Sequence, residues 1–426
     1  MRSSPHVGHR HTPSLPRPGR ARPWRVIHAC EHARDVLPVV EGQVAAGMRP
    51  FIVTPQGGGT AEVYLAGKRQ EPQRTLSLLR AWQDVRNWRK SLLDCAVETS
   101  SDLVHAHSFA AGMAGVRSCS CVAYDLRACI EEMAVSAQLC EPGSWMGRSF
   151  RVAEQFVLSR AAAVIVHSEG MRQAALERGG AAENVFLVPD PLDREDDPLL
   201  FPDVEFLGRR YGLRSDAVSF FVPQFVADGA GKLSPSAFSA LEGFALACNE
   251  LPQFKLLVEA PESARKAINE QTGRLGISAH VELVHQLDVP ATMQCAHVVV
   301  ALGEIPADTV AARQPNQVCL RSMWQGKTLL AADVPRNRDA TPEGKGCLWF
   351  EADNPRDLGY RMAFLGRKPE FRAALGAAGR MYVFETRNTT AIGEKYDEAY
   401  RHATGRRKTG PQQPGLHILR PETSCG

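Results

Sequence analysis

The chain is 426 residues long, with 44% apolar and 23% charged residues and a formal net charge of +3. These values are typical of a soluble globular protein with room for two domains, and they exclude a disordered or fibrous chain. The charge is also too balanced for a dedicated nucleic-acid binder, because the basic excess lies largely in the terminal segments.

Membrane-spanning and disulfide-rich classes are also disfavoured. No apolar run approaches the roughly 20 residues that cross a bilayer, and the N-terminus lacks the apolar stretch of a secretory signal. Cys119 and Cys121 form a Cys-x-Cys pair, but no Cys-x-x-Cys pair suggests a zinc or redox framework. We therefore expect reduced cysteines and a cytoplasmic protein, with peripheral contact at the inner face of the membrane left open.

The first half of the chain alternates short apolar runs with helical stretches. Residues 1–22 are rich in Pro, Arg, Ser and His, which predicts a disordered tail. Val36, Val40 and Val44 then recur every four residues, as in a helix, and the glycines of QGGGT at 56–60 predict a loop. Strands are predicted at 24–30, 49–55, 102–107, 121–126, 163–168 and 184–189.

A second series follows a Pro/Asp-rich segment, PDPLDREDDPLLFPD, at 189–203, which predicts an interdomain linker. The last periodic segment, 369–402, is predicted to be helical throughout, and residues 404–426 a flexible tail. Strands of the second series are predicted at 218–224, 254–260, 280–285, 297–303, 328–334 and 347–352.

Continuous apolar strands that alternate with helices predict an α/β protein with parallel sheets covered on both faces. We expect two doubly wound domains, residues 23–203 and 204–385. A ligand site is then expected in the cleft between them, at the carboxyl ends of strands. This pattern alone fits many enzymes.

Several segments, taken in order, resemble glycosyltransferase family 4. VAYDLRACIEEM is similar to that family's acceptor-side "Y-E-V-R…W-E" motif, and MWQGKTLLAADVPRNRD resembles "M-A-x-G-x-P-V-V-A-S-D-V-x-G-x-x-E" in its second domain. AEQFVLSRAAAVIVHSEG resembles the helix and strand near the end of its first domain. The resembling segments are 102–116, 122–133, 153–193, 323–339, 344–362 and 394–403.

The resemblance implies a GT-B fold, in which two Rossmann-like doubly wound parallel-sheet domains face each other across a cleft. It also implies that a final helix, 386–403, packs back on the first domain. The activity implied is transfer of a sugar, with retention, from a nucleotide-diphosphate donor to a glycan or lipid-linked acceptor. The second domain would hold the nucleotide sugar, which is a substrate, and the first the acceptor; no metal and no cofactor are implied.

The chain departs from the family at the donor site. The family's Glu-x7-Glu pair, which grips the transferred sugar and the ribose, aligns with Arg313 and Arg321. A carboxylate accepts hydrogen bonds from vicinal hydroxyls, whereas a guanidinium only donates them. The arginines would instead bind phosphates or an acidic sugar. The alternative is that donor binding is lost or reshaped and both arginines are surface residues.

The donor diphosphate needs positive charge or free helix N-terminal amides. Asn316 is a plausible N-cap of a helix that faces the cleft, and Gln317, which opens that helix, is assigned to the donor site with it. Lys232 lies where the family has a phosphate-binding lysine, although Gln224 replaces the preceding arginine. The alternatives are that Asn316 only caps a helix and that Lys232 is solvated.

The catalytic candidates are Asp125, Arg127 and Glu131, which follow a predicted strand where side chains enter the cleft. The alternative interpretation is that these residues form a local ion pair with no catalytic role.

Acceptor-side candidates are His28, Glu31 and His107. His105 lies two residues before His107 on the same predicted strand, so the two side chains point the same way, and one of them is a candidate to line the cleft. For these histidines a hydrogen-bonded position in the core is favoured over a catalytic role.

The leading hypothesis is a cytoplasmic glycosyltransferase of cell-surface polysaccharide synthesis. A rival hypothesis is a catalytically inactive relative that scaffolds or regulates a polysaccharide assembly complex. A GT-B sugar epimerase is a third possibility, which would need the same nucleotide site.

Overall fold

The structure is a computed structural model, and the predicted tail at 1–22, most of the predicted linker and Gln224 lie outside the residues that it describes. The described residues are 23–31, 36–54, 57–60, 78–119, 121–190, 204–213, 217–223, 232–285, 289–303, 313–341 and 345–405.

The first lobe is built on a sheet with the order β3-β2-β1-β4-β5-β6-β7, in which all neighbours are parallel except β3. All six strands predicted for this half are confirmed. The prediction of a loop at the glycines was wrong, because residues 57–60 form edge strand β3, which pairs antiparallel with β2. Glycine lacks a side chain but keeps its backbone N–H and C=O groups, so it can still form the hydrogen bonds of a strand pair. The strands are β1 (Arg25–Ala29), β2 (Arg49–Thr54), β3 (Gly57–Thr60), β4 (Leu103–Ala106), β5 (Val122–Asp125), β6 (Ala163–Val166) and β7 (Val185–Leu187).

Serines start three helices of this lobe. The hydroxyls of Ser108, Ser144 and Ser168 each accept the backbone N–H three residues later, which satisfies one of the free amides of a first turn. Helix α3, with 22 residues, is absent from the predicted elements. The helices are α1 (Leu37–Ala45), α3 (Leu78–Thr99), α4 (Phe109–Val116), α5 (Ile130–Ser136), α6 (Trp145–Arg160) and α7 (Glu169–Glu177).

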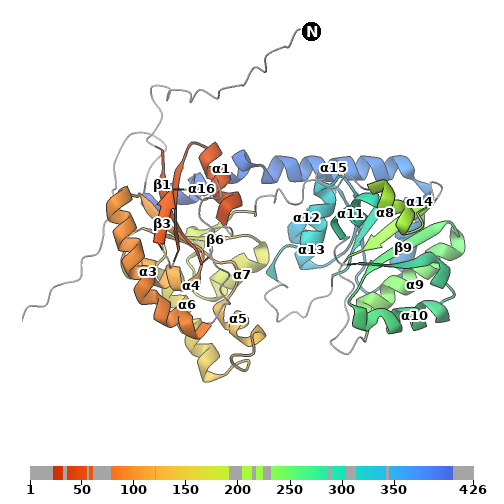
Figure 1. The fold of residues 1–426 in the computed structure, drawn as a ribbon, viewed down its shortest axis with the longest axis horizontal. Coiled ribbons are helices and arrows are strands. Elements are labelled where there is room, and N and C mark those ends of the chain that lie inside the picture. The colour runs from red at the N-terminus through yellow and green to blue at the C-terminus, as the bar shows by residue number, and fades with distance from the viewer. Residues whose placement is uncertain are drawn as a thin grey trace, which may run out of the picture.

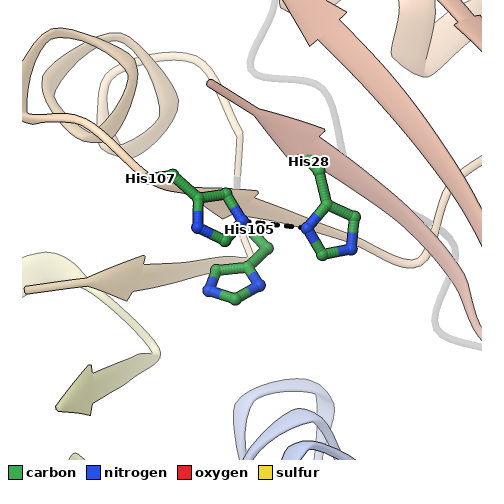
Figure 2. A group of neighbouring side chains, drawn as sticks. All are labelled: His28, His105 and His107. Atoms are coloured by element: carbon green, nitrogen blue, oxygen red, sulfur yellow. Dashed lines mark hydrogen bonds between the residues drawn. The ribbon is translucent and has the colours of Figure 1, made fainter. Parts of the chain in front are cut away.

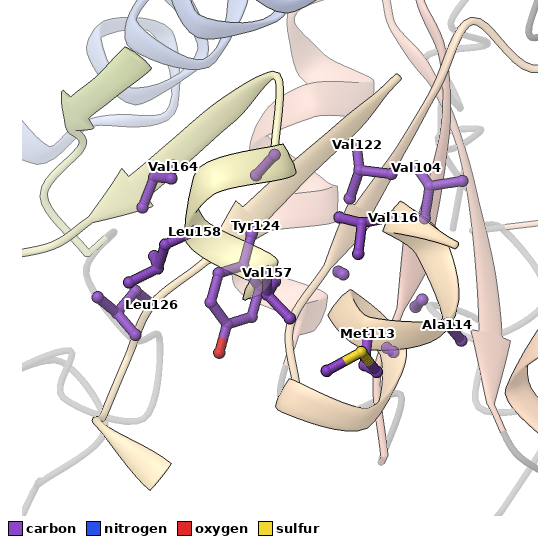
Figure 3. Close-up of a cluster of buried hydrophobic side chains, with 14 of the residues drawn as sticks. Val104, Met113, Ala114, Val116, Val122, Tyr124, Leu126, Val157, Leu158 and Val164 are labelled. Carbon is purple, nitrogen blue, oxygen red and sulfur yellow. The ribbon is translucent and has the colours of Figure 1, made fainter. Parts of the chain in front are cut away.

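Helices α4 and α6 pack on β5 around Tyr124, Met113 and Val157 (Figure 3). This close packing requires Gly112, because a Cβ there would lie 2.8 Å from the Tyr124 ring. The tight contact between helix and strand fixes the carboxyl end of β5, where Asp125 lies.

The second lobe repeats the winding, with the order β10-β9-β8-β11-β12-β13 and all pairs parallel. The predicted fold class, two Rossmann-like doubly wound sheets, is therefore confirmed (Figure 1). The strands are β8 (Val218–Val222), β9 (Phe254–Glu259), β10 (Val281–Val284), β11 (Val298–Ala301), β12 (Thr328–Ala332) and β13 (Cys347–Phe350). The helices are α8 (Val204–Arg210), α9 (Pro235–Glu250), α10 (Arg265–Arg274), α11 (Val289–Cys295), α12 (Gln317–Trp324), α13 (Pro335–Ala340) and α14 (Pro355–Arg367).

The C-terminal segment, predicted to be helical throughout over 369–402, forms two helices, α15 (Pro369–Arg387) and α16 (Thr389–Thr404). Asn388 breaks it: its backbone is extended, and its side chain accepts the amide of Ala391 at 2.8 Å as an N-cap. Helix α15 runs along the second lobe, and α16 lies against the first (Figure 1). Among the described helices, none combines the length and hydropathy needed to cross a membrane.

Helix α16 buries Tyr396 and Tyr400 in the same apolar cluster as Trp24 and Leu103 of the first lobe. Helix α15 packs on the second lobe at a glycine, since a Cβ at Gly376 would lie 2.3 Å from a backbone carbonyl oxygen. The break at Asn388 therefore lets the C-terminal segment pack on both lobes, α15 on the second and α16 on the first.

Candidate functional site

Polar side chains gather at the carboxyl ends of five neighbouring parallel strands of the first lobe. His28 lies near the end of β1, His107 follows β4, Asp125 ends β5, His167 follows β6 and Asp190 comes after β7. Because parallel strands end at one edge of the sheet, residues far apart in the sequence meet there.

Asp125 is the centre of this group. Its carboxylate accepts the Nδ1–H of His107 at 2.9 Å, the Nε2–H of His167 at 2.7 Å and the Nε–H of Arg127 at 3.2 Å. Burial alone would raise the pKa of this carboxyl, but Arg127 and His167 hold the pKa of Asp125 well below its ordinary value. We name these four residues the Asp125 cluster.

His167 carries a positive charge by geometry. Its Nδ1 faces the backbone carbonyl of Val188 at 2.6 Å and its Nε2 faces Asp125, and both partners only accept hydrogen bonds. Both ring nitrogens must therefore hold a proton. The pKa of His167 moves in the same direction: burial lowers it, but Asp190 and Asp125 raise it above the ordinary value.

A chain of hydrogen bonds continues inward from His107. His107 Nε2 lies 2.9 Å from His28 Nδ1, as Figure 2 shows, and His28 Nε2 lies 2.8 Å from the Gln43 side chain. Gln43 lies 2.9 Å from the Tyr400 hydroxyl, which lies 2.9 Å from His105 Nδ1. The chain thus joins two strands, β1 and β4, and two helices, α1 and α16, in one polar core.

Proton counting limits the states of this chain. His107 donates to Asp125, so a neutral His107 must accept at Nε2, and His28 must then donate from Nδ1. A neutral His28 then accepts a hydrogen bond at Nε2, so the NH2 group of Gln43 must face it. If the oxygen of the Gln43 amide faced His28 instead, His28 would have to donate from both nitrogens, and His28 and His107 together would carry one extra proton. Burial, followed by the neighbouring His107, lowers the pKa of His28 to about 3, which favours the neutral state.

His28, His105 and His107 are also the group in which ring nitrogens come closest to a metal-binding arrangement within the described residues. However, the 2.9 Å between His28 and His107 is shorter than the roughly 3.3 Å that separates two nitrogens on a tetrahedral zinc ion. The other ring nitrogens face Gln43, Tyr400 and Asp125. The geometry fits a hydrogen-bonded cluster better than a metal centre.

Arg127 is the solvent-accessible member of the Asp125 cluster, with 38% of its side chain exposed. Its second nitrogen donates to Asp190 at 3.2 Å, and Arg387 donates to the backbone oxygen of Asp190 at 3.0 Å. Burial would lower the pKa of Arg127, but Asp125 and Asp190 raise it above its ordinary value. The arrangement fixes a permanent positive charge at the rim of the first lobe.

The second lobe meets this rim through Arg313. Its Nε donates to Glu132 at 3.2 Å, its backbone oxygen accepts from Ser168, and the neighbouring Gln314 donates to the backbone of Arg127. A Cβ at Gly170 would lie 3.0 Å from the Arg313 carbonyl oxygen, so this position suits glycine. Arg313, predicted to bind the donor, is thus an inter-lobe contact.

The other predicted donor residues lie on or near α12 and α9. Arg321 and Gln317 are exposed on one face of α12, and Lys232 is exposed just before α9. Asn316 is buried: its oxygen caps Val318 at 3.0 Å, and its NH2 donates to the Asn337 side chain. The capping function of Asn316 is therefore confirmed, and its contact with a donor stays a prediction.

Two further predicted residues lie apart from the Asp125 cluster. Glu131 accepts from Arg151 of α6 at 2.6 Å, and Glu31 accepts from Ser108 at 2.9 Å. The predicted catalytic trio is thus not brought together: Asp125 and Arg127 are bonded, and Glu131 faces a different helix.

Sequence reasoning missed His167, Asp190, Gln43 and Tyr400. The first two follow predicted strands, so the rule that selected Asp125 applied to them equally. Gln43 and Tyr400 lie on helices 357 positions apart in the sequence, and no local pattern marks either as a partner of a histidine.

Comparisons with known proteins agree with this architecture. Residues 32–191 match the family described as "Glycosyl transferase 4-like domain". No curated protein matches the chain.

Solved structures match over both lobes at low identity. A glycosyltransferase from Rickettsia africae shares 12% identity and a TM-score of 0.63, covering 90% of this chain and 100% of its own. Anabaena HepE, in complex with UDP and glucose, shares 14% identity and a TM-score of 0.59, covering 88% and 98%. Sucrose-phosphate synthase from Thermosynechococcus elongatus shares 15% identity and a TM-score of 0.56, covering 90% and 100%. The two lobes form a GT-B fold, and the match to the glycosyl transferase 4-like model covers most of the first lobe.

Proposed function

We propose that this protein is a glycosyltransferase that moves a sugar from a nucleotide-diphosphate donor to a glycan or lipid-linked acceptor. We further propose retention at the anomeric carbon, no requirement for a metal ion and a place in cell-surface polysaccharide synthesis. The observation that carries the proposal is the family match over the first lobe. The HepE structure, which holds UDP and glucose in the same fold, supports a UDP-sugar as the first donor to test.

Arg127 is the group that we assign to the reacting centre. Its guanidinium is held by Asp125 and Asp190 and is still accessible, so it needs no rearrangement to face a charged reaction partner. It would stabilise negative charge on the leaving diphosphate or orient the acceptor. Asp125 is fully buried and acts as a positioning residue, with His167 locking its second oxygen.

The donor would lie against the second lobe, where Lys232, Gln317 and Arg321 are exposed. Lys232 and Arg321 would supply positive charge to a pyrophosphate. A cytoplasmic location is part of the proposal. All ten cysteines among the described residues are free, which suits a reducing compartment.

The test is incubation with UDP-, GDP- and ADP-sugars, scored for hydrolysis or transfer, together with calorimetric titration of UDP and GDP. Arg127→Gln is expected to lower turnover about a hundredfold or more while nucleotide binding is retained. Arg89→Gln, an exposed arginine on α3 of the first lobe, is the matched control. Absence of binding to any nucleotide sugar at millimolar concentration would end the proposal.

A second candidate is a catalytically inactive scaffold or regulator of a polysaccharide assembly complex. Its support is Arg313, which replaces a sugar-binding glutamate and whose guanidinium is bound to Glu132. Arg321→Glu separates the two candidates. A gain of nucleotide binding would indicate a decayed donor site, and loss of an existing activity would indicate that this arginine serves the donor.

A further inference from the structure

An open apolar groove lies on the outer surface of the first lobe, between α4 and α6. It has a volume of about 570 Å³, and Met113 and Phe156 lie among its lining residues. Two apolar side chains of α6 stand beside it in solvent: Trp145 is 73% exposed and Val152 is 63% exposed. Contiguous exposed apolar surface that is rimmed by polar residues is a mark of protein and membrane interaction sites. We name this region the α6 groove.

Positive charge surrounds the α6 groove. Arg117 and Arg148 line it, and neither has an ion-pair partner among the described residues. Arg160 stacks on the Phe156 ring at 4.6 Å. The outward surface therefore offers cations that the fold itself does not neutralise.

Acidic side chains on α6 do not offset this charge. Glu154 is the helix's one acidic residue, and it is fully buried, with its carboxylate accepting the amide of Ile130 at 3.1 Å. Arg151 is paired inward with Glu131. The exposed face of α6 therefore combines an aromatic and an aliphatic side chain with arginines and has no carboxylate.

We propose that the α6 groove docks the protein on an anionic phospholipid surface. Trp145 sits in the first turn of α6 and Val152 two turns later, with Arg148 between them, so apolar and cationic side chains project from one face. Such a helix lies in the interface of a bilayer, with its aromatic ring at the headgroup level and its arginines on lipid phosphates. An acidic protein would use the arginines but would not need an exposed tryptophan beside an apolar hollow.

Docking through α6 also orients the cleft. Arg151 and Glu154 tie α6 to the start of α5, whose Glu132 reaches Arg313 of the second lobe. A bilayer against α6 would lie close to the mouth of the cleft, where a lipid-linked acceptor would be presented. This last step rests on the proposed function; the docking itself does not.

The experiment is co-sedimentation of the full chain with phosphatidylcholine vesicles, with and without about a third phosphatidylglycerol. The basic terminal segments would also attract anionic vesicles, so the comparison between variants carries the test. Arg117→Gln and Arg148→Gln are each expected to weaken binding about fivefold, and Trp145→Ala more than that. Arg356→Gln and Phe384→Ala, exposed on the second lobe, are the matched controls and should bind like the wild type.

Vesicle-induced blue shift of tryptophan fluorescence provides a second measurement, which Trp145→Ala should reduce. Equal loss of binding in the control variants, or wild-type binding by Trp145→Ala and Arg148→Gln, would overturn the proposal. Self-association that Trp145→Ala abolishes, without vesicle binding, would assign the groove to a second copy instead. Because no nucleotide sugar is present, failure here is distinguishable from failure of the transferase proposal.

Discussion

Replacing Asp125 with Asn tests whether the Asp125 cluster is held together as described. The variant keeps the shape of the side chain but removes its charge, and its NH2 group would face an N–H of His107 or His167. Two charged donors, the buried His167 imidazolium and the partly exposed Arg127, would lose the buried carboxylate and keep only Asp190 as an anionic neighbour. Breaking a buried pair of this kind costs about 3–5 kcal/mol, and we expect that loss in the free energy of unfolding.

The assay is equilibrium urea unfolding followed by circular dichroism, with Asp333→Asn as the matched control. Asp333 forms an exposed ion pair with Arg338 on the second lobe, so its replacement should cost less than about 1 kcal/mol. If Asp125→Asn is no more damaging than the control, then the carboxylate does not organise its neighbours, and the positioning role assigned to it is refuted.

Three further changes probe other parts of the molecule. In an NMR titration His28 should stay neutral down to about pH 3, whereas His167 should remain protonated above pH 6.5. The lowered pKa of His28 therefore removes stability as the pH falls from about 6.5 toward 3, and the raised pKa of His167 removes stability as the pH rises through its folded value. Arg313→Ala removes an ion pair worth about 0–1 kcal/mol, so it should enlarge the radius of gyration in X-ray scattering only slightly; a large increase would show that this contact locks the lobes together. Gly376→Ala should lower the free energy of unfolding by about 1–3 kcal/mol, because the added methyl group would overpack against a backbone carbonyl. Gly208→Ala, with open space around the residue, is the control and should be neutral or slightly stabilising. Similar losses in both variants would contradict the close contact of α15 with the second lobe at Gly376.

The strands were predictable because their signal is local. The run AVIV at 163–166 is apolar throughout, since β6 is buried on both faces, and the strand predicted at 163–168 differs from the observed one only at the end. Edge strand β3 lacks that signal, because three of its four residues, Gly57 to Gly59, have no apolar side chain, and the strand is formed by backbone pairing with β2. The break at Asn388 falls close to residue 386, where the family resemblance starts the final helix, whereas the periodic pattern alone runs from 369 to 402.

The site was predictable only where it follows from the sheet. Asp125 and Arg127 were selected because they follow a predicted parallel strand, and the two are bonded to each other at the carboxyl end of β5. Roles inferred from the family at Arg313 and Asn316 could not include the tertiary partners, Glu132 and Asn337, that determine what each side chain contacts. A motif specifies a residue's place in the chain but not the group that binds it across the cleft.

The Arg313 contact bears on whether the cleft admits a donor. Glu132 accepts from Arg178 at 2.8 Å as well as from Arg313, so it keeps a cation when the lobes part. Arg313 has 29% of its side chain exposed and would hydrate on release, which keeps the cost of opening near the 0–1 kcal/mol of a surface ion pair. Neither group is left buried and uncompensated. Arg313 therefore holds the two lobes together without locking them, and under the proposed function donor binding would depend on the exposed face of α12, where Arg321 lies.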